Sequence, residues 1–165
     1  LIYEHLRYRL KSEKSMQAKL EARGLPLTPY SALCEVRDAI GFRVVCRFID
    51  DIYKNISRIK NLPGITVVKE KDYILDVKSN GYRSYHMILS VEAPYEDVRG
   101  DNPGHFFVEI QLRTIAMDSW ASLEHEMKYK HHIRNAPLIE QELKRCADEL
   151  ASCDISMQKI GRAHV

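Results

Sequence analysis

Apolar and polar side chains alternate over residues 106–112, and this pattern constrains the fold more than any other segment does. Val108, Ile110 and Leu112 fall on one face of an extended strand, because successive side chains of a strand point to opposite faces. The other face carries the polar residues of the segment: Glu109, Gln111 and Arg113. The pattern predicts a strand with one apolar and one polar face, in a sheet that packs helices against it.

Helix and strand signals surround this segment. A single helix is predicted over residues 1–23, because apolar side chains recur there at roughly helical spacing before a glycine and a proline. Further strands are predicted over 42–49, 65–68 and 82–91, and further helices over 50–62, from 115 to about Lys130, and over 137–160. Residues suited to begin these helices are Asp50 or Asp51, Thr114 and Pro137. The order predicts an α+β fold, with one mixed β-sheet and flanking helices.

The length and composition fit one domain. The chain has 165 residues, of which 45% are hydrophobic, so wholesale disorder is not expected. We expect a single domain over residues 1–165, with its core at about 9–130 and a C-terminal helix at about 137–160. No apolar run approaches the ~20 residues of a membrane span, and no signal peptide is recognisable, so no membrane partner is expected.

The cysteines indicate a reducing compartment. None of the four belongs to a Cys-x-x-Cys pair, which argues against a zinc site. Cys34 and Cys46 lie in or beside apolar runs and are interpreted as reduced core residues, which favours a cytoplasmic location.

Several common catalytic motifs are absent from the sequence. It has no Walker-type phosphate loop, no Gly-x-Gly-x-x-Gly dinucleotide fingerprint and no Gly-x-Ser-x-Gly nucleophile elbow. His125-Glu126 begins like a zinc-protease motif, but the second histidine would have to stand at Tyr129.

Polar residues nevertheless gather in segments that suit phosphoryl-group transfer. Asp38 precedes a predicted strand and Glu109 lies on one, so the two carboxylates can share a Mg²⁺ if those strands are neighbours. Lysine and arginine side chains can neutralise a polyphosphate, and Tyr82 and Asp118 can stack on and hydrogen-bond a guanine. Each residue also has an ordinary structural explanation as a turn, strand or surface residue. Taken alone, their spacing indicates only a domain that handles phosphate.

Longer motifs narrow this interpretation. They are a basic stretch at 9–19, Asp-x-x-Gly-x-Arg at 38–43, Lys-Asp-Tyr-Ile at 71–74, Lys-Ser-Asn-Gly-Tyr-x-Ser-x-His at 78–86 and Glu-x-Gln-x-Arg-Thr-x-x-Met at 109–117, followed by Trp-Ala, Glu-His and Tyr-Lys at 120–121, 124–125 and 129–130. In order, spacing and identity these segments resemble the synthetase domain of the RelA/SpoT family. The resemblance spans about residues 9–130.

The resemblance implies a nucleotidyltransferase-like fold and a defined reaction. Members of the family transfer the β,γ-pyrophosphate of ATP to the 3′-hydroxyl of GDP or GTP, which yields the alarmone (p)ppGpp and AMP. By this resemblance Asp38 and Glu109 are the catalytic residues and hold Mg²⁺, with Glu109 also suited to accept the 3′-hydroxyl proton. The implied ATP-binding residues are Arg9, Lys11, Lys19 and Arg43. The implied GDP- or GTP-binding residues are Lys78, Tyr82, His86, Gln111 and Asp118.

Two positions depart from the family pattern. Val77 stands before Lys78, where a proline is usual, which changes the stiffness of the loop but not its charge. Asp118 is often asparagine in small synthetases, but a carboxylate can still accept hydrogen bonds from guanine. The preference between GDP and GTP is left open.

The resemblance also indicates a small, synthetase-only enzyme, because no His-Asp dipeptide of the family's hydrolase domain occurs. Similar proteins form homotetramers through terminal helices, so a homo-oligomer is expected. An apolar stripe of the last helix could form the contact between subunits: Leu138, Leu143, Ala147 and Leu150. Packing of this stripe within one chain is an equal alternative.

Two other functions remain open from the sequence. One is the transfer of a nucleotidyl group on a related fold. The other is a catalytically silent nucleotide- or RNA-binding module, although nucleic acid is not required for the expected reaction.

Overall fold

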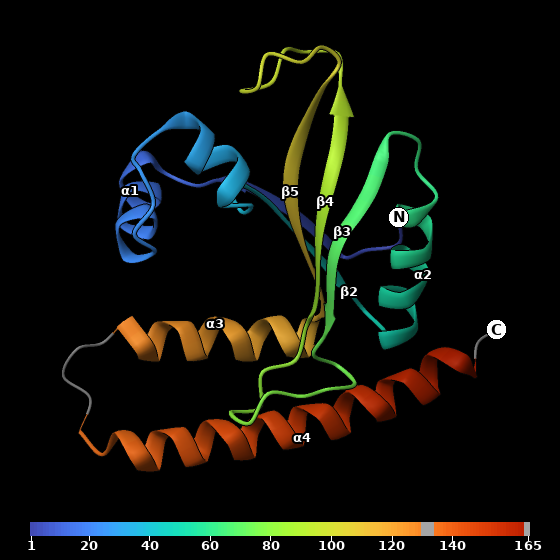
Figure 1. The fold of residues 1–165 in the computed structure, drawn as a ribbon. Coiled ribbons are helices and arrows are strands. Elements are labelled where there is room, and N and C mark those ends of the chain that lie inside the picture. The colour runs from blue at the N-terminus through green and yellow to red at the C-terminus, as the bar shows by residue number, and fades with distance from the viewer. Residues whose placement is uncertain (130–133, 164–165) are drawn as a thin grey trace.

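A five-stranded sheet forms the centre of the molecule, in the order β1-β2-β5-β4-β3 (Figure 1). The structure is a computed structural model that describes residues 1–129 and 134–163. Its strands are β1 (His5–Leu10), β2 (Ile40–Cys46), β3 (Ile65–Asp72), β4 (Tyr85–Ala93) and β5 (Gly104–Thr114). Its helices are α1 (Glu13–Ala22), the π-helical turn η1 (Ser31–Glu35), α2 (Ile49–Lys60), α3 (Ile115–Tyr129) and α4 (Ala136–Arg162). The predicted α+β fold with one mixed sheet is confirmed, since β2 and β5 are parallel and the other pairs antiparallel.

The apolar face of the sheet carries the main core. Val108, Ile110 and Leu112 of β5 pack with Ile52 and Ile56 of α2, and all five are buried. The alternation predicted for β5 is therefore confirmed, because its apolar positions face α2. In Figure 1, α2 covers this face while α1, η1 and α3 lie on the other side of the sheet. The polar positions of β5 point to that second side.

The prediction of one helix over residues 1–23 is wrong. The segment forms β1 and then α1, and β1 pairs antiparallel with β2 at the edge of the sheet. Leu6, Tyr8 and Leu10 also alternate with polar residues, so this stretch fits a strand as well as a helix. Pairing with β2, which lies about thirty residues further along the chain, decides between the two. Ser12 then begins α1 by accepting a hydrogen bond from the backbone N–H of Ser15.

Other element boundaries moved by a few residues. β3 continues to Asp72 rather than ending near 68, and β4 begins at Tyr85 rather than at 82. The turn η1 was not anticipated. Thr114 begins α3 as predicted, because its hydroxyl accepts a hydrogen bond from the backbone N–H of Met117. The predicted end of α3 near Lys130 lies outside the described residues.

The long helix α4 crosses beneath the sheet and packs along α3 (Figure 1). Leu143, Ala147 and Leu150 pack against Trp120 of α3, whereas Leu138 is exposed. These three residues of the predicted apolar stripe therefore pack within the chain.

The four cysteines are free thiols. Burial raises the pKa of the Cys46 thiol to about 11, which makes it an unreactive core residue as predicted, while Cys34 is only half-buried. None of the described helices has the length and apolar composition that crossing a membrane requires.

Candidate active site

A row of polar residues crosses the whole sheet on the face opposite α2. Residues paired across neighbouring strands share a face, so the register places their side chains side by side. The row contains one residue from each strand: Arg7 of β1, Arg43 of β2, Gln111 of β5, His86 of β4 and Lys71 of β3. Three of these residues were predicted to bind nucleotide, and the sheet brings them into line.

A second row lies two residues along the strands. Arg9 of β1 pairs with Gly41 of β2, which pairs with Glu109 of β5. The side chain of Arg9 crosses over Gly41, since a Cβ at that position would lie 3.7 Å from Cγ of Arg9. Because glycine has no side chain, Arg9 has room to lie against the sheet on the same face as Glu109. The strand that follows Asp38 (β2) and the strand that carries Glu109 (β5) are neighbours, as the shared-cation interpretation requires.

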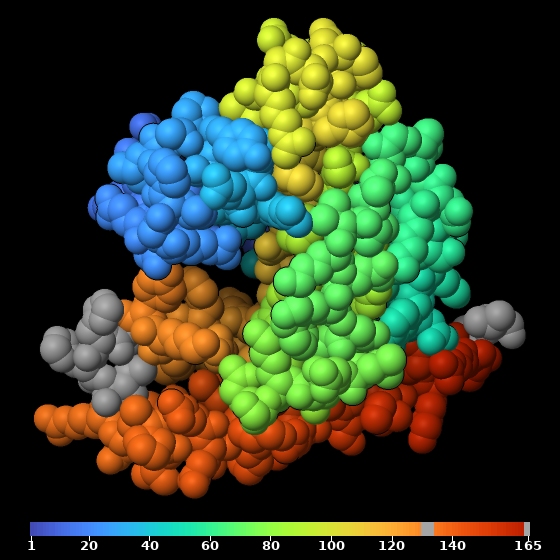
Figure 2. All heavy atoms as spheres, in the orientation of Figure 1, coloured from blue at the N-terminus to red at the C-terminus, as the bar shows by residue number. Residues whose placement is uncertain are grey.

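These rows line an open cavity of about 200 Å³. Figure 2 shows this side of the molecule hollowed between the blue N-terminal segment and the orange helix α3. The cavity contains five of the predicted site residues: Arg9, Asp38, Arg43, Glu109 and Gln111. Arg7 also lines it, so two carboxylates and three guanidinium groups face one space, which suits a polyphosphate with a bound cation.

The two carboxylate oxygens of Asp38 have different surroundings. Oδ2 lies 2.6 Å from Nζ of Lys19 and 3.2 Å from Nζ of Lys11. Oδ1 is buried and has no hydrogen-bond partner among the described residues. Burial would raise the pKa of Asp38, but the hydrogen bonds and charges of Lys19 and Lys11 outweigh it, so the pKa is lowered. An ionised carboxylate thus keeps one oxygen for a further ligand, beside two ammonium groups.

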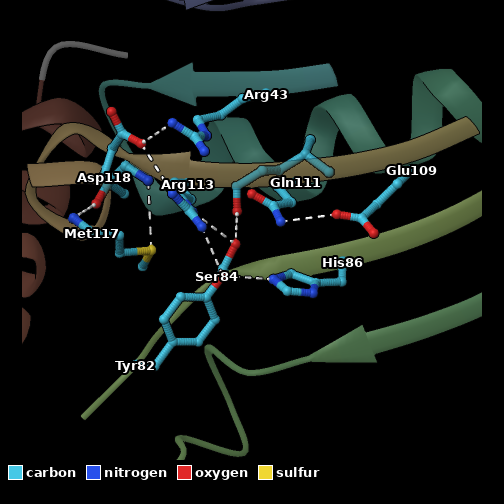
Figure 3. Close-up of polar contacts among 11 residues, drawn as sticks. Arg43, Tyr82, Ser84, His86, Glu109, Gln111, Arg113, Met117 and Asp118 are labelled. Atoms are coloured by element: carbon cyan, nitrogen blue, oxygen red, sulfur yellow. Dashed lines mark hydrogen bonds and ion pairs between the residues drawn. The ribbon is translucent and has the colours of Figure 1, made fainter. Parts of the chain in front are cut away.

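Glu109 is oriented by its neighbour on β5. The side-chain amide of Gln111 donates a 2.9 Å hydrogen bond to Oε1 of Glu109 (Figure 3). Both side chains point to the cavity side of the sheet. The bond fixes the direction of the carboxylate, so that Oε2 can accept from a bound substrate.

A second group of residues surrounds the hydroxyl of Tyr82. Nη2 of Arg113 donates to this oxygen at 2.7 Å, and Nε2 of His86 lies 2.8 Å from it (Figure 3). Nζ of Lys78 lies 5.1 Å from the centre of the Tyr82 ring and 4.7 Å from that of Tyr73. A positive charge held over aromatic faces is stabilised by the ring electrons and remains available to a phosphate.

His86 is held neutral by its surroundings. Burial lowers its pKa to about 4, and the positive charges of Arg113, Lys78 and Lys71 act in the same direction. Because Arg113 already donates to the Tyr82 oxygen, the hydroxyl hydrogen is available to Nε2 of His86.

Asp118 connects the two groups. Its Oδ1 lies 3.1 Å from Nη1 of Arg113 and 3.6 Å from Nη1 of Arg43 (Figure 3). Arg43 lines the cavity and Arg113 belongs to the group around Tyr82, so Asp118 links the two clusters. All eleven predicted site residues lie in one or the other. Lys11 and Lys19 join the first cluster through Asp38, and Lys78 joins the second through the tyrosine rings.

Several residues of the site were not predicted, among them Arg7 and Lys71 of the first row, Arg113 and Tyr73. Arg113 is only 5% exposed and contacts Tyr82, Ser84 and Asp118. The alternation that singled out Glu109 and Gln111 also contains Arg113, and that signal could have identified it. Tyr73 packs edge-on against Tyr82 and His86, and it lies within the Lys-Asp-Tyr-Ile motif.

Comparison with known protein families identifies the family to which the chain belongs. The family model described as "Region found in RelA / SpoT proteins" matches residues 8–134. The chain belongs to the RelA/SpoT family. The matched region contains all eleven predicted site residues, and it agrees with the span of about 9–130 expected from the motifs.

Named relatives of this RelA/SpoT-family chain are similar over most of its length. It is 38% identical to the GTP pyrophosphokinase YwaC of Bacillus subtilis (strain 168), over 88% of this chain and 67% of the relative. The crystal structure of small alarmone synthetase 1 from Bacillus subtilis, bound to its product pppGpp, matches with a TM-score of 0.82 and 32% identity, over 99% of this chain and 80% of that one. The same synthetase bound to AMPCPP matches with a TM-score of 0.72 and 28% identity, over 99% and 78% of the two chains.

Proposed function

We propose that this chain is a GTP pyrophosphokinase, which transfers the β,γ-pyrophosphate of ATP to the 3′-hydroxyl of GDP or GTP to form (p)ppGpp and AMP. The observation that carries the proposal is the continuous polar face on which Asp118 joins a cavity with two carboxylates to the Tyr82 cluster. Its relatives are named for this activity, and a similar structure holds the product pppGpp. Membership of the family does not favour the alternative of a catalytically silent binding module.

The cavity is proposed to bind ATP. Arg9 and Arg43 present guanidinium groups that can grip phosphate oxygens in pairs, and Lys11 and Lys19 add two ammonium groups at its edge. In the free protein these lysines neutralise Asp38. The negative charge of a triphosphate can take over that pairing when it enters.

The donor set of this cavity fits Mg²⁺. Asp38 and Glu109 supply carboxylate oxygens, and Oδ1 of Asp38 has no partner within the described residues. No group of three or more His, Cys, Asp or Glu side chains placed to hold a metal ion occurs in the described part of the chain, this cavity included. Two carboxylates suffice, because Mg²⁺ commonly takes its remaining ligands from water and substrate phosphates. When bound there, Mg²⁺ would neutralise charge on the transferring phosphates.

Glu109 is proposed to accept the proton of the attacking 3′-hydroxyl. Gln111 holds Oε1 of the carboxylate and leaves Oε2 for the substrate. No covalent intermediate is needed, since phosphoryl-type transfer depends mainly on positioning and charge neutralisation.

The Tyr82 cluster is proposed to bind the acceptor nucleotide. The ring of Tyr82 can stack on guanine, while Lys78, neutral His86 and Gln111 contact its phosphates and ribose. Both ion pairs of Asp118 are made to Oδ1, so Oδ2 can accept hydrogen bonds from N1 and N2 of guanine.

The proposal extends to the assembly and the location of the enzyme. Leu138, Ile155 and Ile160 of α4 are each more than half exposed, which supports a homo-oligomer such as a tetramer. We also propose a cytoplasmic location, where ATP and guanine nucleotides are available, with no requirement for nucleic acid.

The reaction can be tested directly. The protein is incubated with Mg²⁺, radiolabelled ATP and GDP or GTP, and the products are separated by chromatography beside a Glu109→Gln control. We expect a guanosine tetra- or pentaphosphate and AMP from the wild type, and a rate at least 100-fold lower from the variant. Omission of Mg²⁺ should also stop the reaction. No product from a wild-type protein that binds neither nucleotide would overturn the proposal.

A further inference from the structure

We propose that Asp154 of α4 is a positioning residue for the acceptor nucleotide, acting through Thr114; this inference rests on the function proposed above. Asp154 lies outside both clusters and has no part in the mechanism described so far. It is nevertheless one of the most deeply buried polar residues described, with 3% of its surface exposed.

The surroundings of Asp154 are unfavourable for a carboxylate. Oδ1 is buried without a hydrogen-bond partner among residues 1–129 and 134–163. Burial raises the pKa of this carboxyl, although the Thr114 hydrogen bond and the charge of Arg83 oppose the rise. A buried oxygen without a partner costs folding free energy, which makes it relevant what the other oxygen does. That oxygen, Oδ2, accepts a 2.7 Å hydrogen bond from the hydroxyl of Thr114.

This bond sets the direction of the Thr114 hydroxyl. A hydroxyl has one hydrogen to donate, and here it is donated to Asp154. The oxygen of Thr114 is then turned to accept from the backbone N–H of Met117, at 3.2 Å, in the first turn of α3. Asp154 therefore supports the interaction that begins α3, although it is forty residues away in the sequence.

The start of α3 belongs to the acceptor cluster. Thr114 directly follows Arg113, whose guanidinium holds both Tyr82 and Asp118. Asp118 lies in the first turn of α3, so its carboxylate moves with this turn. If the Thr114 bond is lost, the turn can rotate and carry Asp118 away from Arg113. Guanine recognition would weaken before any other part of the site changes.

A second contact supports the same relationship between α4 and the acceptor cluster. Nη1 of Arg83 donates a 2.8 Å hydrogen bond to the carbonyl oxygen of Ala147 in α4. Arg83 is the neighbour of Tyr82, so α4 is fastened next to the stacking tyrosine and next to Arg113. The proposed donor residues come instead from β1, α1, the segment between them, and β2. Among them Arg43 approaches Asp118, at 3.6 Å compared with 3.1 Å for Arg113. Because this contact is the longer of the two, we expect a change at α4 to alter donor binding by less than about twofold.

The test compares binding of the two nucleotides to four forms of the whole protein by titration calorimetry. GDP probes the acceptor site, and the non-hydrolysable ATP analogue AMPCPP probes the donor site. The forms are wild type, Asp154→Ala, Asp154→Asn, and Glu149→Ala on the exposed side of the same helix. We expect Asp154→Ala to weaken GDP binding about five- to tenfold, as loss of a helix cap would, with AMPCPP affinity within twofold. Asp154→Asn keeps an acceptor oxygen for Thr114 and should stay within about twofold of wild type, as should Glu149→Ala.

Thr114→Val and Thr114→Ser provide an independent pair. Valine keeps the shape but removes the hydroxyl, so it should reproduce the selective loss of GDP affinity, whereas serine should not. Retained AMPCPP binding shows that a variant is folded. Equal losses of both nucleotides in Asp154→Ala and Thr114→Val, or no loss in either, would overturn the inference alone. A wild-type protein that binds neither nucleotide would overturn the proposed function, and the inference with it.

Discussion

The guanidinium of Arg113 donates a 2.7 Å hydrogen bond to the hydroxyl of Tyr82, and this bond joins β5 to the segment that precedes β4 on the acceptor side of the site. Arg113 is the last residue but one of β5, whereas Tyr82 precedes β4 by three residues. The same guanidinium contacts Asp118 of α3 at 3.1 Å. One buried cation thus sets the position of the proposed stacking ring relative to the proposed guanine acceptor.

Replacement of Arg113 by lysine should impair the acceptor site selectively. Lysine keeps the charge but cannot reach Tyr82, Ser84 and Asp118 from one planar group. We expect KM for GDP or GTP to rise about tenfold or more, as for the loss of a charged hydrogen bond, while KM for ATP changes little. Steady-state kinetics with each substrate varied in turn would measure this. Arg145→Lys, an exposed arginine of α4, is the matched control and should behave as wild type.

An alanine at Gly81 should destabilise the loop that carries Tyr82. Gly81 has a φ of +99°, and a Cβ there would lie 2.6 Å from Cβ of Ala147 in α4. Both the backbone strain and the clash oppose the substitution, so we expect a loss of about 2–4 kcal/mol in the free energy of unfolding. Urea denaturation would measure it. Gly24→Ala is the matched control, because Gly24 has a φ of +66° with open space around it, and should cost only about 1 kcal/mol. Equal costs at the two positions would show that the contact with α4 is absent.

The neutral state of His86 should make stability fall in mild acid. Its pKa is about 4 in the folded protein and about 6.5 when unfolded, so between these values the unfolded chain binds an extra proton. The free energy of unfolding should therefore decrease as the pH falls from about 6.5 toward 4. Denaturant unfolding across this range should show the dependence in the wild type and a shallower one in His86→Gln. His5→Gln, in the exposed edge strand, controls for the loss of an imidazole elsewhere. The lowered pKa of Asp38 makes the free energy of unfolding depend on pH only below about the ordinary value of 3.8, which lies outside this window.

Much of the site could be predicted because its residues lie in short local patterns. The alternation of Glu109, Gln111 and Arg113 follows from the geometry of one strand. The β3–β4 region was also recognisable from its motifs, including the Asn-Gly-Tyr segment that carries Tyr82. The edge strand β1 was missed because its apolar spacing fits two periods, and only pairing with β2 distinguishes them.

The sequence by itself determined the family, the α+β class and the identities of most of the residues on the polar face, because these depend on motifs and on the periodicity of side chains along one segment. Only the tertiary structure decided how these residues are partnered. The pairing of Lys11 and Lys19 with Asp38, the bonds of Arg113 and the contact of Asp154 with Thr114 all join distant segments or elements. Such contacts depend on strand register and helix packing, which form only when the chain closes on itself.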